Sequence, residues 1–529
     1  MSTKNSPTTT LGPNCRAGAK YLYLTTPIYY PNANPHLGHA YTTVLGDTIH
    51  RYHQLMGDNS IFLTGTDEHG QKVAEAAAAR GVSPQMHVDE LSRNFQENWH
   101  RLLIEATIFM RTTTPSHISG VQSTLSRLYQ QGLIYKSDYE GWYCISEEIF
   151  YTEKDLVNGM SPTGKPVTKV TESNYFFKMS QFQEQIIQYL REHTDFIIPT
   201  QRMAEVLGFL QQPLQDLCIS RPKSRLSWGI ELPFDHDFVC YVWFDALLNY
   251  VTALGYQAQS EHDDKFTNYW NNAVHLVGKD ILTTHAIYWS AMLMALDLPL
   301  PRHIYAHGWW LNAEGKKMSK SEGETVSPQR LIETLGPDQT RYFLIRSMHA
   351  GSDASFSIEN AISVINDDLA DRFGNLLSRA SNLAAQHFAG KLPSGTLTDA
   401  RSLQLRELAS ETIRAVLQHA RDLEPDKGLQ KLNFFLDCAN KYISDLAPWK
   451  LAKDEKTKPL AGETIYVSLE SVRIAAVLLW PVIPQKSASV LAFFGNHDPV
   501  PTPETLVWGV LPSGLPITKA PPLFPKLQK

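Results

Sequence analysis

The chain has 529 residues, of which 43% are hydrophobic and 19% are charged. This length and composition indicate a globular, soluble protein with about two to four domains and a large core. No apolar run approaches the roughly 20 residues that cross a bilayer, which excludes a membrane-spanning chain. Because 48 Lys and Arg face 54 Asp and Glu, the net charge is −6, so contact with nucleic acid requires a local basic surface.

The five cysteines are scattered and odd in number. This usage argues against a disulfide framework and for a reducing compartment, so we expect a cytoplasmic protein. Residues 1–20 have no acidic residue and lack the apolar centre of a secretory signal. We expect them to form a short disordered tail, with a truncated organelle transit peptide as the alternative.

The first part of the chain alternates between strand and helix signals. Aromatic and β-branched runs predict strands, and apolar residues at helical spacing predict helices. In chain order these are a strand at 21–27, a helix at 39–56, a strand at 60–64 and a helix at 72–80, with later strands at 273–277 and 303–306. This order predicts a Rossmann-like α/β domain around a parallel sheet with right-handed crossovers.

The rest of the chain changes character twice. Short β-type runs broken by Gly, Pro and Asn at 134–178 indicate a small β-rich insertion, and the almost wholly helical pattern of 328–486 predicts a separate α-helical bundle. The expected divisions are a tail at 1–20, the first half of the α/β domain at 21–115, an insertion at 116–235, the second half at 236–327, a helical domain at 328–495 and an extended, proline-rich tail at 496–529.

Two histidines lie where the first strand passes into the first helix. A helix start offers unpaired N–H groups and a partial positive charge, and Gly38 lets a phosphate approach the backbone closely. The imidazoles of His36 and His39 can donate hydrogen bonds to a phosphate that gains negative charge. Alone, such histidines are more often helix caps or surface residues.

A second segment, KKMSKS at residues 316–321, is basic and carries hydroxyl groups, with Gly323 close behind. The ammonium groups of Lys317 and Lys320 on a mobile loop can close over a triphosphate and stabilise the leaving pyrophosphate. Ser319 and Ser321 belong to the same expected ATP site. For this segment alone, a solvated charge run is a competing interpretation.

Together, and in this order, the two segments resemble the signature sequences of class I aminoacyl-tRNA synthetases. The resemblance is closest to the methionyl-tRNA synthetase family and covers residues 21–527. The stretches that carry it are TPIYYPNANPHLGH at 26–39, TGTDEHG at 64–70, ISRP at 219–222, YVWFDA at 241–246, GKDI at 278–281 and APW at 447–449.

The resemblance implies a methionine–tRNA ligase activity. Such an enzyme activates L-methionine with ATP, as its Mg²⁺ complex, to methionyl-adenylate and pyrophosphate. It then transfers methionine to the terminal adenosine of tRNA(Met) for protein synthesis, including initiation. The absence of a large editing insertion in a chain of this length favours methionine over Leu, Ile or Val.

The resemblance also implies the positions of the methionine site. A thioether side chain requires a long, apolar, aromatic-lined slot. The residues placed there are Ile28, Tyr30, Asp67, Trp243, Leu247, Tyr250, Asp280, Ile281, His285 and Trp289. Taken singly, each apolar member is more readily explained as core. Leu247 departs from the family, which often has proline there.

Two charged residues of this set, and Arg221 outside it, have specific expected roles. Asp67 would hold the substrate ammonium. Asp280 would support it, with capping of the following helix as the alternative. Arg221 matches an arginine that the family places at the substrate carboxylate or the phosphates, and a surface salt bridge is its alternative.

The family frequently carries zinc knuckles built on Cys-x-x-Cys in the insertion. Here the first pair of positions reads YCISE at 143–147, and the second falls at about Met160 and Thr163. Because one thiolate cannot form a tetrahedral structural zinc site, we expect no zinc. Apolar packing should instead close the knuckle, by residues such as Trp142, Ile149 and Phe150.

The helical domain is expected to read the tRNA anticodon. Trp449 matches a tryptophan that stacks on an unstacked base, although a tryptophan packed on the bundle is the alternative. Arg372 matches an anticodon-contacting arginine. Asp368 occupies a position that is often asparagine, and an ionised carboxylate can only accept hydrogen bonds, so its contact with a base is doubtful. Without an appended dimer-forming domain, we expect a monomer.

Two other functional classes remain as alternatives. One is a tRNA-binding or regulatory relative without catalysis, against which the intact His36, His39, Lys320 and Asp67 argue. The other is a nucleotidyltransferase that uses a similar histidine turn on a small metabolite, but such enzymes are usually short and have no helical domain of this kind.

Overall fold

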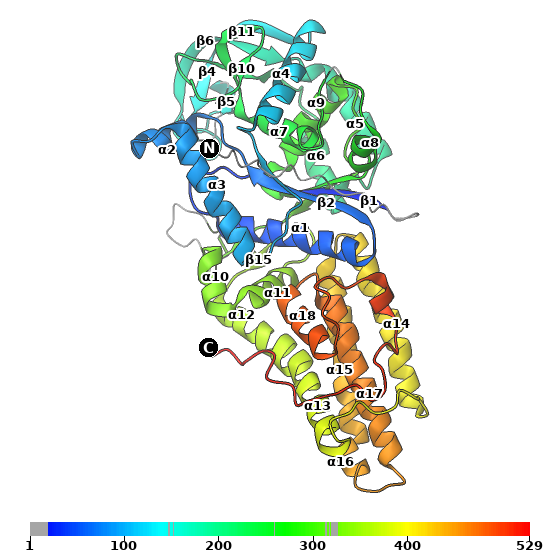
Figure 1. Ribbon diagram of the computed structural model, residues 1–529. Helices are drawn as coiled ribbons and strands as arrows, with labels where there is room; N and C mark the ends of the chain where they lie inside the picture. Colours follow the sequence, from blue (N-terminus) through cyan, green and yellow to red (C-terminus); the bar gives the residue numbers. More distant parts are fainter. Residues whose placement is uncertain are drawn as a thin grey trace, which may run out of the picture.

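The structure is a computed structural model that describes residues 20–146, 149–151, 153–258, 260–312, 315–316, 318 and 326–528. An α/β region lies above a helical bundle, and the long helix α1 (Leu37–Leu55) lies between them (Figure 1). This architecture confirms the predicted fold class, a Rossmann-like domain with a small β-rich insertion, followed by a helical bundle.

The main sheet has the strand order β3-β2-β1-β12-β13-β7, and all of its strand pairs are parallel. Its strands are β1 (Tyr21–Thr25), β2 (Asn59–Thr66), β3 (Ile108–Arg111), β7 (Ile197–Ile198), β12 (Ala273–Gly278) and β13 (His303–His307). The central strand β1 is buried almost throughout because helices cover both faces, which is why it is a continuous aromatic and aliphatic run. The expected strands are thus confirmed as β1, β2, β12 and β13.

Helices surround this sheet. They are α1, α2 (Gln71–Ala79), α3 (Pro84–Arg101), α4 (Pro115–Gln130), α5 (Gln183–Glu192), α6 (Met203–Phe209), α7 (Val242–Thr252), α8 (Asp264–Trp270) and α9 (Ser290–Ala295), with the π-helix η5 (Thr284–Trp289). The short 3₁₀ turns are η1 (Glu153–Asp155), η2 (Met179–Phe182), η3 (Thr200–Arg202) and η4 (Lys279–Ile281). The helix expected at 39–56 is α1, and it ends before Gly57, whose φ of 78° favours glycine.

The insertion is built from two small antiparallel sheets at the top of Figure 1. One contains β4 (Ile134–Cys144), β5 (Ile149–Tyr151), β6 (Thr168–Phe177) and β8 (Leu217–Cys218). The other contains β9 (Ser220–Pro222), β10 (Glu231–Leu232) and β11 (Asp235–Cys240). The range 116–235 also contains β7, which pairs with β13 in the main sheet. This part of the chain therefore contributes an edge strand to the α/β region.

The bundle begins after β14 (Trp310–Leu311), which pairs in parallel with β15 (Ala354–Ser355), a strand between α11 and α12. Its helices are α10 (Pro328–Leu335), α11 (Pro337–Ser347), α12 (Ile358–Val364), the π-helix η7 (Ile365–Gly374), α13 (Asn375–His387), α14 (Ala400–Arg421), α15 (Pro425–Leu446), α16 (Pro448–Leu451), α17 (Lys458–Leu479) and α18 (Pro484–Phe493). Helix α17 is buried on all sides, which explains its apolar sequence.

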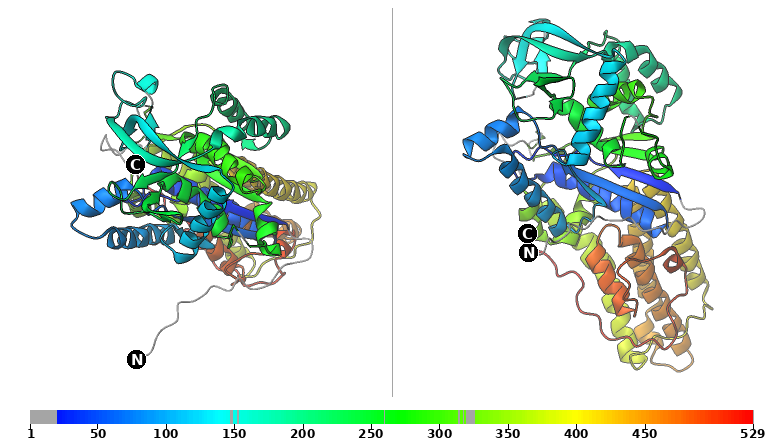
Figure 2. Two further views of the ribbon diagram at one scale, coloured as in Figure 1. Left: turned by 90° about the horizontal axis from the view of Figure 1, so that it is seen from above. Right: turned by 45° about the horizontal axis from the view of Figure 1, so that its top comes forward.

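After α18 the chain returns as an extended segment along the bundle, interrupted by the short turn η8 (Pro503–Leu506) (Figure 2). Buried Arg473 of α17 fixes this segment by donating hydrogen bonds to the carbonyl oxygens of Thr505 and Val507, both at 2.6 Å. Within the described ranges, no helix has the length and apolar character needed to cross a membrane.

Candidate active site

A cavity of about 420 Å³ opens at the carboxyl ends of the central strands. Its walls come from the loop after β1, the start of α1, Asp67 after β2, one face of α7, the turn after β12 and the segment after β13. In open α/β sheets, ligands bind outside the carboxyl ends of the strands, where loops can carry functional groups without disturbing the sheet. The cavity is therefore the candidate active site.

His36 and His39 meet at the start of α1. His36 is the N-cap residue, and its Nδ1 accepts a hydrogen bond from the backbone N–H of Gly38 at 3.1 Å. His39 Nδ1 accepts from the backbone N–H of His36 at 3.4 Å, and the two rings stack with centroids 3.7 Å apart. Both residues line the cavity, as does Gly38. The sequence-based alternatives of capping and phosphate contact are therefore compatible, because the same rings cap the helix and face the cavity.

One described residue of the lysine segment and one residue after it line the same cavity. Lys317, Ser319, Lys320 and Ser321 lie outside the described residues, but Met318 and Val326 line the cavity. The backbone N–H of Leu37 donates to the carbonyl oxygen of Val326 at 3.0 Å. Val326, which follows the segment, therefore lies beside the start of α1, and Met318 within the segment lines the same cavity.

Most of the residues expected at the methionine site surround this one cavity. Those that line it are Ile28, Tyr30, Asp67, Trp243, Leu247, Tyr250, Asp280, Ile281 and His285. Trp243 and Tyr250 both project from α7, as their spacing of seven residues predicts. Trp289 does not line the cavity. It is fully buried, and its indole donates to His275 Nε2 at 3.1 Å, so it packs in the core.

A hydrogen-bonded chain fixes the polar groups at the apolar end. The Ile281 carbonyl oxygen can only accept, so His285 Nδ1 is the donor across their 2.9 Å contact. Burial lowers the pKa of His285 to about 4, so its ring is neutral and Nε2 accepts from the Tyr250 hydroxyl at 2.8 Å. The neutral pair of His285 and Tyr250 therefore lines the slot without introducing a charge. An uncharged lining suits a thioether side chain.

Asp280 also faces the cavity, in the turn η4 after β12. Its Oδ1 accepts a hydrogen bond from the Trp309 indole at 3.2 Å. The turn has Gly278 as its N-cap and no side-chain capping bond, so the alternative role of Asp280 as a helix cap is not observed. Lys279 beside it pairs with Asp353 at 2.8 Å, which ties η4 to the segment between α11 and α12.

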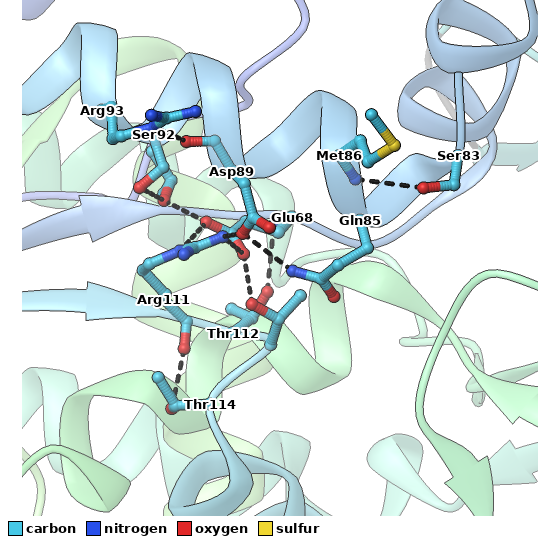
Figure 3. A network of polar contacts seen from close by, with 12 residues as sticks. Glu68, Ser83, Gln85, Met86, Asp89, Ser92, Arg93, Arg111, Thr112 and Thr114 are labelled. Carbon is cyan, nitrogen blue, oxygen red and sulfur yellow. Dashed lines mark hydrogen bonds and ion pairs between the residues drawn. The ribbon is translucent and has the colours of Figure 1, made fainter. Parts of the chain in front are cut away.

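Asp67 reaches the cavity from a loop that is anchored on both sides. Glu68, fully buried, accepts two hydrogen bonds from Arg111 at 2.6 and 3.0 Å, and Arg111 also donates to Asp89 of α3 at 2.6 Å (Figure 3). On the other side, His69 Nδ1 lies 2.9 Å from Oδ2 of buried Asp245 on α7.

Comparisons with known proteins agree with this geometry. The family described as tRNA synthetases class I (M) matches residues 22–168 and 152–381, and the anticodon binding domain of methionyl tRNA ligase matches 392–529. A methionine–tRNA ligase of Caldanaerobacter subterraneus subsp. tengcongensis is 43% identical over 96% of this chain and 79% of its own length. One from Halalkalibacterium halodurans is 43% identical, with 96% and 78% covered.

Solved structures lead to the same family. Methionyl-tRNA synthetase of Mycobacterium tuberculosis in complex with methionyl-adenylate has a TM-score of 0.90 and 38% identity, covering 96% of this chain and 100% of that one. The free form of the Mycobacterium tuberculosis enzyme has a TM-score of 0.84 and 35% identity, with 97% and 99% covered. The chain belongs to the methionyl-tRNA synthetase family. The resemblance seen in the sequence is thereby confirmed.

Arg221 does not line the cavity, although its position matches a substrate-contacting arginine of methionyl-tRNA synthetases. It is only 3% exposed, which excludes the alternative of a surface salt bridge. Its guanidinium lies 4.6 Å from the ring centre of Tyr241 and 5.1 Å from that of Tyr143, and it donates to the Ser220 carbonyl oxygen at 2.7 Å. In this structure Arg221 therefore joins the insertion to the strand–α7 junction.

Residues expected to read the anticodon lie on the bundle. Asp368 is 7% exposed and accepts hydrogen bonds from Tyr342 at 2.8 Å and Asn433 at 3.0 Å. It also pairs with Arg372, one turn further along η7. Asp368 thus faces inward and orients Arg372. Trp449 is 37% exposed at the start of α16, the end of the bundle farthest from the sheet (Figure 1).

The knuckle of the insertion differs from a zinc site. Cys144 Sγ lies 3.2 Å from the Ser146 hydroxyl, and Ser161 Oγ lies 3.2 Å from Thr163 Oγ1. The donors at these positions are mostly hydroxyls, which do not fit structural zinc. Over the ranges that the structure describes, no group of three or more His, Cys, Asp or Glu could hold a metal.

The sequence-based search missed several cavity residues. Thr42, Asn249, His307, Trp309 and Trp310 line the cavity but were not among the expected site residues. Asn249 was the most accessible to prediction, because it precedes Tyr250 in the matched α7 segment and is a polar residue in an apolar helix. Trp309 and Trp310 come shortly before the lysine segment in the sequence. This proximity to an expected ATP-binding segment was the signal that could have indicated them.

Proposed function

We propose that this chain is a methionine–tRNA ligase. It activates L-methionine with ATP to methionyl-adenylate and pyrophosphate, and then transfers methionine to the terminal adenosine of tRNA(Met), serving protein synthesis and its initiation. The observation that carries the proposal is the single cavity that joins an aromatic slot to the histidine pair of α1. The family relationship supports the same conclusion.

In the first step, the methionine carboxylate attacks the α-phosphate of ATP and pyrophosphate leaves. No covalent enzyme intermediate is required, so the protein contributes alignment and charge stabilisation. His36 and His39 contact the phosphates from the start of α1, where the helix dipole also favours negative charge. Lys317 and Lys320 contact them from the other side, with Ser319 and Ser321. Mg²⁺ accompanies ATP, bound through phosphate oxygens and water.

Methionine is selected by the slot between α7 and η5. Trp243, Tyr250 and Ile281 offer aromatic and aliphatic surface to the thioether chain, and the neutral ring of His285 closes its end. Asp67, which is buried and lines the same cavity, holds the ammonium group. Because the Leu247 side chain is larger and more flexible than the proline common in the family, the slot wall next to Ala246 has its own shape here.

The bundle recognises the anticodon. Arg372 and Trp449 provide a cation and an exposed aromatic ring, which suit hydrogen bonding to and stacking on unstacked bases. Asp368 acts by holding Arg372, since its carboxylate accepts bonds from within the bundle. We place the enzyme in the cytoplasm as a monomer. The free thiols of Cys144, Cys218, Cys240 and Cys438 fit a reducing compartment, and light scattering would measure its mass in solution.

The test is methionine-dependent exchange of labelled pyrophosphate into ATP, followed by charging of tRNA(Met). We expect exchange with methionine and none with leucine, isoleucine or valine. A folded protein that binds tRNA(Met) without exchange would instead be the non-catalytic relative. Exchange that depends on a small metabolite other than an amino acid would identify a nucleotidyltransferase.

A further inference from the structure

Asn249 has an unusual position for an amide side chain. It lies in the last turn of α7, a helix whose other buried residues are mainly apolar, and it is only 1% exposed. Asparagine is a poor helix former because its side chain competes for backbone hydrogen bonds. A residue that is unfavourable both for the helix and for burial points to a role that offsets this cost.

The orientation of this amide is fixed by the helix itself. Asn249 Nδ2 donates to the carbonyl oxygen of Ala246, one turn earlier, at 2.5 Å. The opposite orientation would bring two oxygen atoms together, so the position of Oδ1 is determined. Among the protein atoms that the structure describes, Oδ1 is buried and has no hydrogen-bond partner. Such a buried acceptor is rare in native proteins and calls for a donor.

Asn249 lines the substrate cavity, so this donor can come from a ligand. Asp67 and the adjacent Tyr250 line the same cavity. Burial chiefly raises the pKa of Tyr250. The Asp67 carboxylate raises it further, whereas a hydrogen-bonding contact with the Asn249 side chain lowers it. The amide and the carboxylate thus act on the same phenol.

The donors of the two small substrates differ in position. Methionine has one donor group, its ammonium, because its carboxylate and thioether can only accept. ATP has donors on its adenine and ribose, but its phosphates are handled at the His36 and His39 end. The corner beside Asp67 is where the proposed function places the ammonium. One carboxylate can satisfy only part of a group with three N–H bonds.

We propose that Oδ1 of Asn249 accepts a hydrogen bond from the ammonium group of L-methionine, so that Asn249 and Asp67 bind this group together. The proposal rests on the proposed function and adds a substrate-binding residue to it. It also gives a physical reason for an amide in this helix. A neutral acceptor beside a carboxylate binds a cation without adding a second negative charge to a buried corner.

The test is equilibrium binding of two ligands to the full chain by calorimetry. The ligands are L-methionine and 4-(methylsulfanyl)butanoate, which lacks only the amino group. In Asn249→Ala, methionine should bind at least about tenfold more weakly, while the affinity of the deamino acid, measured by displacement, should change less than about twofold. Asn249→Leu fills the same space with an apolar group and should give the same pattern if the alanine variant is poorly folded.

The matched control is Asn174→Ala. Asn174 is a fully buried amide of the insertion whose Nδ2 and Oδ1 are both hydrogen-bonded, to Glu172 at 2.7 Å and Ser220 at 3.0 Å. It should lose stability without selective loss of methionine binding. Equal weakening of both ligands in Asn249→Ala, or an unchanged methionine affinity, would overturn the proposal. Failure of the wild-type chain to bind methionine would overturn the proposed function as well, which separates the two cases.

Discussion

At the residue scale, three consecutive side chains after β2 point in three directions. Asp67 lines the cavity, Glu68 binds Arg111, and His69 binds Asp245. Asp245 is buried, yet despite this burial its pKa lies below the usual range because of His69 and His117. Glu68 and His69, the two residues that follow Asp67, are therefore held by contacts to different elements. Under the proposed function, the Asp67 carboxylate is thus positioned before the methionine ammonium binds, which limits the entropy lost on binding.

Arg111 acts in this scheme as a positioning residue. Arg111→Gln removes the guanidinium that balances buried Glu68, so the loop should shift and the protein should lose thermal stability. We expect the KM for methionine in pyrophosphate exchange to rise about tenfold or more, with the KM for ATP within about twofold. Arg111→Lys should recover part of the loss, because it keeps the charge but not the two-pronged contact.

A matched control is available on α3. Arg101 pairs with Glu333 at 3.5 Å, and both side chains are largely exposed. Since such surface pairs contribute only about 0–1 kcal/mol, Arg101→Gln should leave both KM values unchanged. A folded Arg111→Gln variant with unchanged methionine KM, or with equal increases for methionine and ATP, would contradict a role for Arg111 in placing Asp67.

At the element scale, hydrogen bonds close the knuckle of the insertion. The Ser161 hydroxyl is buried and accepts from the backbone N–H of Lys165 at 3.1 Å, while the Ser161 N–H donates to the Lys165 carbonyl oxygen at 2.9 Å. Met160 bridges to Val157 and Pro166 through the backbone. Of the residues expected to close the knuckle by apolar packing, Trp142 is half-buried, and the side chains of Ile149 and Phe150 lie outside the described residues.

These contacts predict a knuckle that is stable without metal. Elemental analysis of the purified chain should find well under one zinc per molecule, and dialysis against a chelator should leave Tm unchanged. The reason is that hydroxyls and backbone groups hold the turn where a metal site would need thiolates. Stoichiometric zinc, or a Tm that falls with chelation, would show that ligands other than Cys144 complete a site.

Elements with strong periodicity could be predicted from the sequence, whereas short or tertiary features could not. Strands β1 and β12 and helix α1 follow from apolar patterns of sufficient length. Strand β7 has two residues and gains its partner only from β13, so no local pattern indicates it. Arg111 lies 43 residues beyond Glu68, and a contact over that separation depends on the fold. The matched motifs identified residues that line the cavity. They did not indicate that Trp289 and Arg221 are buried away from it.

At the scale of the whole molecule, α1 belongs to both halves. Its first residues face the cavity, and its middle contacts the bundle through buried Asp47. Asp47 pairs with Arg51 at 2.8 Å and with Arg341 of α11 at 2.7 Å. Burial opposes its ionisation, but the two arginines hold the pKa of Asp47 below its usual value. The helix that carries His36 is thus fixed to the domain that is proposed to bind the anticodon.

Arg341 is the residue that closes this connection. It is fully buried, and besides Asp47 it donates to the carbonyl oxygens of Leu102, Pro481 and Val482, at 3.1, 2.8 and 2.8 Å. Arg341→Met leaves these carbonyl acceptors without their donor and removes one of the two arginines that pair with Asp47; breaking comparable buried pairs costs about 3–5 kcal/mol. We expect a Tm lower by several degrees and a larger loss in tRNA charging than in pyrophosphate exchange, because only charging needs both domains in register.

A double variant tests whether Arg341→Met loses stability because Asp47 has lost a partner or because side-chain volume has been removed. Asp47→Leu with Arg341→Met replaces the pair by apolar groups, which is often neutral or stabilising, so Tm should recover relative to Arg341→Met alone. The rate of tRNA charging should recover less completely than Tm, since the apolar pair does not bind the carbonyl groups that fix the orientation of α11. As a control, Lys526→Met breaks an exposed pair with Asp371 on the same bundle and should change neither quantity. If charging and exchange fell in parallel in Arg341→Met, the contact would serve stability alone, and the two domains would communicate by another route.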